Sequence, residues 1–85
     1  MADEGKKVGV ITHFYDKIGV GIVKLDSSIK LGDKLKFSGH DREFEQPVGQ
    51  MQFDHKDIEE AKKGQEVGIK LDNKVKEGDQ VFLAS

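Results

Sequence analysis

The sequence predicts an all-β fold, a small closed six-stranded β-barrel with Greek-key-like connections. A recurring corner, short runs of alternating residues and the glycine content support this prediction. Each corner has a lysine, any residue, a glycine and an aspartate or glutamine, followed by an aliphatic strand. The three corners lie in Ile29–Phe37, Ala61–Leu71 and Val75–Leu83. The 85 residues include 10 glycines and 1 proline, a ratio typical of many tight turns.

The glycine of each corner allows a positive φ at no steric cost, and a following aspartate can accept a hydrogen bond from the turn. We therefore expect a turn directly before a strand at each of Gly32, Gly64 and Gly78. The first aliphatic residues after these turns, Leu35, Val67 and Val81, should be buried because alternate strand residues face the core.

Alternating apolar residues predict the first three strands. The first covers Val8–Phe14, with Val8, Val10, Thr12 and Phe14 on one face. The next two strands are expected at Val20–Leu25 and Asp33–Ser38, separated by a loop.

The second half of the chain predicts three more strands and at most one short helical turn. A hairpin turn is expected at Gly39–Asp41. The strands are Glu43–Phe53, Glu66–Leu71 and Gln80–Ala84. Pro47 cannot donate to a ladder, so it marks an edge or a bend in the first of these. His55–Gly64 is the helical candidate, with a turn around Ile58–Lys62 that is too short to stand alone.

Length and composition restrict the domain organisation and the classes of function that are open to the chain. We expect residues 1–7 to form a flexible N-terminal tail and residues 8–85 a single barrel domain. With no cysteine, disulfides and thiolate zinc sites are excluded. The net charge of −2 is far from that of a strongly basic nucleic-acid binder. This net charge is still compatible with a local stripe of basic residues. The chain has no apolar run of membrane-spanning length and its start lacks a signal-peptide pattern, so we expect a cytoplasmic monomer.

The order of elements resembles the second, β-barrel domain of the translational GTPases such as elongation factor Tu. The segments IKLGDKLKFSG, VGQMQF, AKKGQEVGIKL and VKEGDQV carry this resemblance, which runs from about Val8 to Leu83. No phosphate loop is present, so the resemblance implies the barrel without its GTPase domain and no nucleotide binding. A related barrel is similar to the C-terminal module of a family of collagenase-like peptidases.

The resemblance to the translational GTPases implies a candidate RNA-binding site. Counting back from Gly64 places Gln52 where the family usually has a glutamate that approaches the terminal ribose of tRNA. His55 falls at a basic or histidine position near the same pocket, and Glu66 falls where the family has asparagine. Lys56 and Lys70 are neighbouring candidate contacts. Gln52 lacks the charge of the family residue and Glu66 would repel phosphate, so the sequence departs from the family at both positions.

The sequence therefore predicts a non-enzymatic binding module that contacts RNA, a tRNA end or the ribosome. The alternative is an accessory protein-interaction subunit for a separately encoded enzyme, such as a peptidase or GTPase core. No nucleophile-elbow pattern or calcium-loop spacing is present, which disfavours a hydrolase or a metal protein. We expect no catalytic residue, cofactor, metal or membrane partner.

Overall fold

Strands account for the regular secondary structure of the chain. The computed structural model describes residues 6–39 and 43–84, and within them it contains ten strands and no helix. They are β1 (Lys7–Tyr15), β2 (Val20–Leu25), β3 (Ile29–Lys30), β4 (Lys34–Ser38), β5 (Glu43–Pro47), β6 (Met51–Phe53), β7 (Lys56–Ile58), β8 (Glu60–Ala61), β9 (Glu66–Lys70) and β10 (Gln80–Leu83). The predicted all-β class is confirmed.

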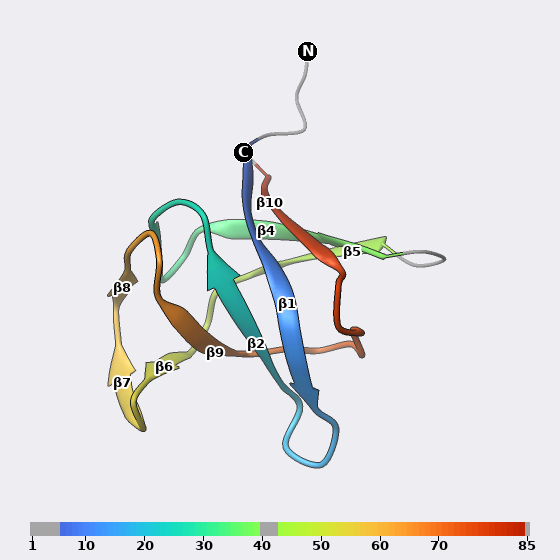
Figure 1. Ribbon diagram of the computed structural model, residues 1–85, viewed down its shortest axis with the longest axis horizontal. Helices are drawn as coiled ribbons and strands as arrows, with labels where there is room; N and C mark the ends of the chain where they lie inside the picture. The colour runs from blue at the N-terminus through green and yellow to red at the C-terminus, as the bar shows by residue number, and fades with distance from the viewer. Residues whose placement is uncertain (1–5, 40–42, 85) are drawn as a thin grey trace.

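The predicted closed six-stranded barrel is wrong. Eight strands form one antiparallel sheet in the order β5-β4-β10-β1-β2-β9-β6-β7, and β3 and β8 pair as a separate two-stranded sheet. Strands β5 and β7 end the large sheet and do not pair with each other, so the sheet curves into an open half-barrel (Figure 1). Pro47 ends β5, at an edge of the sheet, as the sequence predicts.

A side-chain amide bridges the space between the β5 edge and β9. Gln46 Nε2 donates to the Lys70 carbonyl oxygen at 2.9 Å, and Gln46 Oε1 accepts from the Asp72 N–H at 2.8 Å. Gln46 is buried, so both halves of its amide are satisfied inside the fold. The amide links the two segments at one point in place of the continuous ladder that a closed barrel requires.

The three corners share one geometry. Gly32, Gly64 and Gly78 have φ values of 91°, 91° and 95°, as position i+2 of a type II turn requires. In each corner the lysine N–H donates to the side-chain oxygen three residues later. These pairs are Lys30 to Asp33 (3.0 Å), Lys62 to Gln65 (2.8 Å) and Lys76 to Asp79 (3.0 Å). The predicted turns are confirmed, and Leu35, Val67 and Val81 are buried.

Each corner docks on a buried aliphatic residue of another segment. The N–H of Gly32, Gly64 and Gly78 donates to the carbonyl of Val48, Leu25 and Ile11, at 2.9, 2.9 and 2.7 Å. The same three aliphatic residues donate back to the carbonyls of Asp33, Gln65 and Asp79 at 2.9, 2.9 and 2.8 Å. The corners are therefore fixed from both sides by the backbone, which explains why one short pattern recurs three times.

The alternation predicted for the first strand is interrupted in the structure. Register shifts between Lys7 and Gly9 and between Ile11 and His13 interrupt β1. Val8 and Ile11 are buried, and Phe14 packs against the core, whereas Thr12 is half-buried. A bulge adds a residue to one strand and resets the alternation, so strict period 2 fails here.

The predicted helical turn around Ile58–Lys62 is also wrong. Strand β7 folds back on β6 through a two-residue turn at Asp54 and His55, whose φ values are 57° and 66°. Two positive φ values match the type I′ turn of tight hairpins. Strand β8 then pairs with β3, opposite Ile29 and Lys30.

The predicted tail, residues 1–7, lies largely outside the described residues, as does the predicted turn at Gly39–Asp41. Among the residues described, no helix is long and apolar enough to cross a membrane. The expected monomeric state and cytoplasmic location stay predictions.

Candidate functional site

The outer face of strands β1, β2, β9 and β6 presents one continuous row of residues. The backbone register places Gln52 opposite Gly68, Gly68 opposite Ile22, and Ile22 opposite His13. Their neighbours along β6, β9 and β2 are buried, and these are Met51, Ile69 and Val23. Because successive strand residues point to opposite faces, this row faces outward.

Glycine in the middle of the row leaves a shallow hollow of about 190 Å³. Its lining comprises Ile18, Val20, Gln50, Gln52, Gly68 and Lys70. A Cβ added at Gly68 would lie 3.1 Å from Val20 Cγ1. The absence of a side chain at Gly68 thus keeps the floor of the hollow open between β2 and β6.

Lys70 places a cation at the hollow. Its Nζ donates to the Ile18 carbonyl at 2.8 Å, which holds the side chain against the turn between β1 and β2. The side chain is exposed, and Ile18 beside it is 57% exposed. An ammonium group has three donors. Since the described residues supply one acceptor to Nζ, two donors are available to a ligand.

Gln52 lies in the same lining and is oriented by the hairpin. Its Nε2 donates to Asp57 Oδ1 at 2.9 Å, across the β6–β7 pair in which the two residues are opposite. The contact turns the amide nitrogen toward β7 and leaves Oε1 as an acceptor. Gln50, which precedes β6, adds a second exposed amide.

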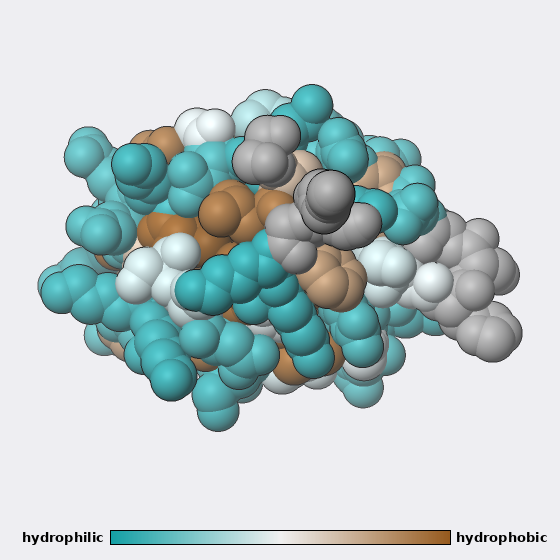
Figure 2. Space-filling model, turned by 90° about the horizontal axis from the view of Figure 1, so that it is seen from above, coloured by the Kyte–Doolittle hydropathy of each residue, from teal (hydrophilic) through white to brown (hydrophobic). Residues whose placement is uncertain are grey.

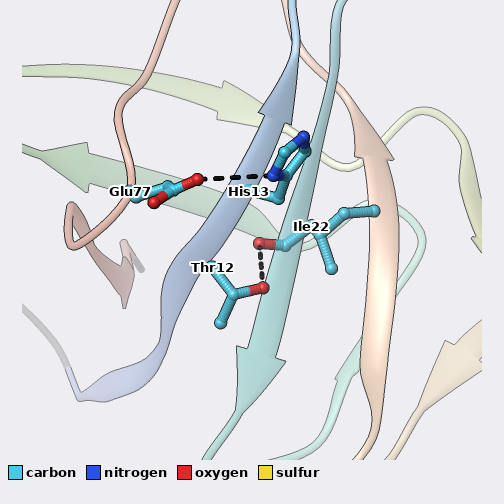
Figure 3. Close-up of polar contacts among 4 residues, drawn as sticks. All are labelled: Thr12, His13, Ile22 and Glu77. Carbon is cyan, nitrogen blue, oxygen red and sulfur yellow. Dashed lines mark hydrogen bonds and ion pairs between the residues drawn. The ribbon is translucent and has the colours of Figure 1, made fainter.

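Polar contacts also organise the β1 side of this face. Figure 3 shows His13 on β1 and Glu77 pointing toward one another, with His13 Nδ1 3.3 Å from Glu77 Oε2. Thr12 Oγ1 donates to the Ile22 carbonyl at 3.3 Å beside the bulge in β1. The His13 ring also lies 4.4 Å from the ring of Tyr15, measured between centroids. These contacts tie the corner before β10 to the outer face.

The structure brings together two of the five predicted site residues. Gln52 and Lys70 line the hollow. The other three predicted residues lie outside the lining. His55 occupies the tip of the β6–β7 turn, and Lys56 begins β7. Glu66 begins β9, opposite Lys24. The side chains of Gln52 and Glu66 are both exposed.

Sequence reasoning missed Ile18, Val20 and Gln50. Ile18 carries a readable signal, because an isoleucine inside the short turn Tyr15–Gly19 has no core to enter and must face solvent or a partner. Val20 and Gln50 carry no such signal, since their place in the lining depends on the pairing of β2 with β9 and of β9 with β6.

The chemistry of this face suits binding. It combines aliphatic side chains, two amides and one ammonium. Figure 2 shows a different face, seen from above, where hydrophilic side chains cover most of the surface around a small apolar area. In the part of the chain that the structure describes, no group of three His, Cys, Asp or Glu side chains lies close enough to hold a metal ion.

Comparison with known proteins connects this chain to part of a protease. No protein-family model matches the chain. The chain is 41% identical over 78 residues to an uncharacterised protease of Methanocaldococcus jannaschii. The match covers 91% of this chain and 19% of that protein, so the chain spans about a fifth of the length of the curated relative.

Solved structures agree on the fold. The C-terminal domain of a candidate U32 peptidase from Geobacillus thermoleovorans superposes with a TM-score of 0.88 at 16% identity, covering 94% of this chain and 93% of that chain. The selenomethionine variant of the same domain gives a TM-score of 0.86 at 16% identity, with coverage of 91% and 98%. At this identity the similarity establishes the shared fold alone.

These relatives overturn the expected resemblance to the second domain of the translational GTPases. The sequence relative is a protease and the structural neighbours are peptidase domains. The segments that suggested elongation factor Tu are largely the three corners, whose residues are those that a type II turn followed by a strand requires. These segments follow from turn geometry, so they no longer support a contact with a tRNA end or the ribosome, and RNA binding stays a prediction.

Proposed function

We propose that this chain is a non-catalytic interaction domain that assists a peptidase. This is the accessory-subunit alternative that the sequence left open, with a peptidase as the enzyme. The domain would contribute a docking face, and the partner would contribute the catalytic residues.

The relation to the archaeal protease carries the proposal. Nearly the whole chain corresponds to a small part of a much larger protein with the printed name of a protease. A stretch of that size is typical of a single domain joined to others. The shared fold with a peptidase's C-terminal domain supports the same proposal.

The outer face gives this role a physical basis. Exposed Ile18 lines the hollow together with Lys70, and exposed Tyr15 lies opposite Val20 of the same lining. Aliphatic and aromatic residues near a single charge are the usual composition of a protein-contact surface. The face therefore suits a protein partner better than it suits a small molecule, because the hollow is shallow and little enclosed.

Affinity capture tests the proposal. The chain, tagged at its C-terminus, is expressed in its native cells and purified in buffer of moderate ionic strength, and the captured proteins are identified by mass spectrometry. We expect a peptidase to co-purify in near-stoichiometric amount. Peptidase activity should appear in the captured complex and be absent from the chain alone. Recovery of the chain without a peptidase, or peptide hydrolysis by the isolated chain, would contradict the proposal.

A further inference from the structure

We infer that the hollow over Gly68 binds an acidic side chain on an extended aliphatic segment of the peptidase partner. The inference rests on the proposed function and specifies its contact chemistry. Ile18 and Val20 supply apolar contact, Lys70 supplies the charge, and Gln50 and Gln52 supply amide groups.

The charges near the hollow repel a monoanionic carboxylate less than they repel a phosphate dianion. Lys70 is the cation in the lining, and its Nζ has two donors beyond the one given to the Ile18 carbonyl. Asp57 contacts Gln52 at the edge of the hollow, and Glu66 lies on the same face of β9. A phosphate dianion would meet both acidic groups with one cation to balance it. The single negative charge of a carboxylate is balanced by Lys70 alone.

The ligand is a side-chain carboxylate, because several backbone N–H groups at the hollow are already bonded within the fold. Capture of a C-terminal carboxylate uses a nest of unpaired N–H groups. Around the hollow, the N–H of Lys70 donates to the Gln50 carbonyl at 3.2 Å, Leu71 to Gly19 at 2.8 Å and Gly19 to Tyr15 at 2.9 Å. These three N–H groups are therefore not available to a chain terminus, whereas the ammonium group of Lys70 is available.

The flanking amides favour an extended segment. The side chain of Gln50 and the Oε1 atom of Gln52 lie on one side of the hollow, and Ile18 and Val20 lie on the other. An extended peptide alternates its side chains and offers N–H and C=O groups to such amides. An aliphatic residue two positions from the acid would then reach Ile18.

A peptide titration tests the inference on the whole chain. The probe is acetyl-Val-Thr-Glu-Thr-Val-amide, which has a valine two positions from the acid on either side, added to the ¹⁵N-labelled chain and followed by NMR. The matched probe has glutamine in place of the glutamate, and inorganic phosphate serves as a third ligand. We expect shifts at Ile18, Gly68 and Lys70 with the acidic peptide, at least fivefold weaker binding of the glutamine peptide, and no site-specific shift with phosphate.

Two charge-reversal variants sharpen the test. Lys70→Glu should lower the affinity for the acidic peptide at least tenfold. Lys56→Glu makes the same change in net charge outside the lining, and it should alter that affinity less than twofold. Both side chains are exposed, so both variants should keep the wild-type amide spectrum elsewhere. Equal binding of both peptides, unchanged binding by Lys70→Glu, or phosphate shifting the same amides would overturn the inference.

Affinity capture with the two variants separates this inference from the proposed function. Capture of a peptidase by the wild type and Lys56→Glu, with loss by Lys70→Glu, supports both. Equal capture by all three overturns the carboxylate subsite and leaves the accessory role standing. Binding of the acidic peptide that depends on Lys70, with no peptidase captured, supports the subsite and contradicts the accessory role.

Discussion

The glycine corners and the β6–β7 hairpin solve the same problem, a sharp reversal of the chain, in opposite ways. Each corner uses a glycine at positive φ, a side-chain oxygen that caps the turn, and two backbone hydrogen bonds to a buried residue. The hairpin places Asp54 and His55 at positive φ, and its two three-residue strands end at a sheet edge. The corners are built for stability, and the hairpin leaves its polar groups on the outer face.

This difference separates two roles within one small domain. The buried residues on which the corners dock, Ile11, Leu25 and Val48, belong to the core. The hairpin contributes Gln52 and its partner Asp57 to the outer face. Changes at the corners should therefore affect folding, and changes around the hairpin should affect binding with little loss of stability.

The largest effect is expected for a residue on which a corner docks. Leu25→Ala should lower the free energy of unfolding by about 2–5 kcal/mol, because it removes buried methyl groups behind the Gly64 corner. Half-buried Ile58 in the hairpin provides the control, and Ile58→Ala should cost roughly 1 kcal/mol or less. Urea denaturation measures both. Equal losses would show that the hairpin contributes as much as the corners.

The next effect tests the corner glycines themselves. Gly78→Ala should cost about 1–2 kcal/mol, because its φ of 95° is strained for a residue with a Cβ even though the surrounding space is open. Gly49 has equally open space without a positive φ, so Gly49→Ala should stay within about 0.5 kcal/mol of the wild type. Thermal unfolding compares the two, and a neutral Gly78→Ala would refute the strain argument.

A smaller loss is expected when the cap of a corner is removed. Asp33→Ala deletes the acceptor of the Lys30 N–H and should cost about 0.5–1.5 kcal/mol. Asp33→Asn keeps an oxygen in place and should recover most of that loss. The denaturant midpoints of the two variants give the comparison. An Asn variant as unstable as the Ala variant would mean that charge, and not the hydrogen bond, sets the effect.

The smallest effect has the opposite sign. His55→Gly should raise the free energy of unfolding by up to about 1 kcal/mol, because glycine relieves the positive φ at the hairpin tip. Lys56→Gly, one residue later at the start of β7, should be destabilising because glycine loses more conformational freedom on folding and no positive φ is relieved there. Chemical denaturation of this pair would show whether the hairpin turn stores strain that the corners avoid.

The sequence was sufficient to locate the corners and the strands that follow them, because glycine, lysine and aspartate are placed there by local turn geometry. It was insufficient for the hairpin. Asp54 and His55 are not a usual hairpin pair, and the charges around Ile58 hide a three-residue strand. The bulges in β1 were equally hidden, because they arise from pairing with β2 and β10.

The candidate site could be predicted only in part, because some of its features are local and others depend on strand pairing. The outward direction of Gln52 and Lys70 follows from strand alternation. Their meeting in one hollow depends on which strands are neighbours and on Gly68, and the incorrect family resemblance added His55 and Glu66, which the hollow does not include. Turns and the direction of strand side chains can be predicted from local sequence, whereas the residues that meet on a surface of three strands depend on the whole fold.

Amide hydrogen exchange, with and without the captured peptidase, tests the separation of stability from binding most directly. The Gly32, Gly64 and Gly78 amides, each bonded to a buried residue's carbonyl, should exchange only through global unfolding in the free chain. The amides of Gln50 and Gln52, which line the hollow, should exchange faster in the free chain and become protected when the partner binds. Rapid exchange at the corners, or no partner protection at Gln50 and Gln52, would contradict the account.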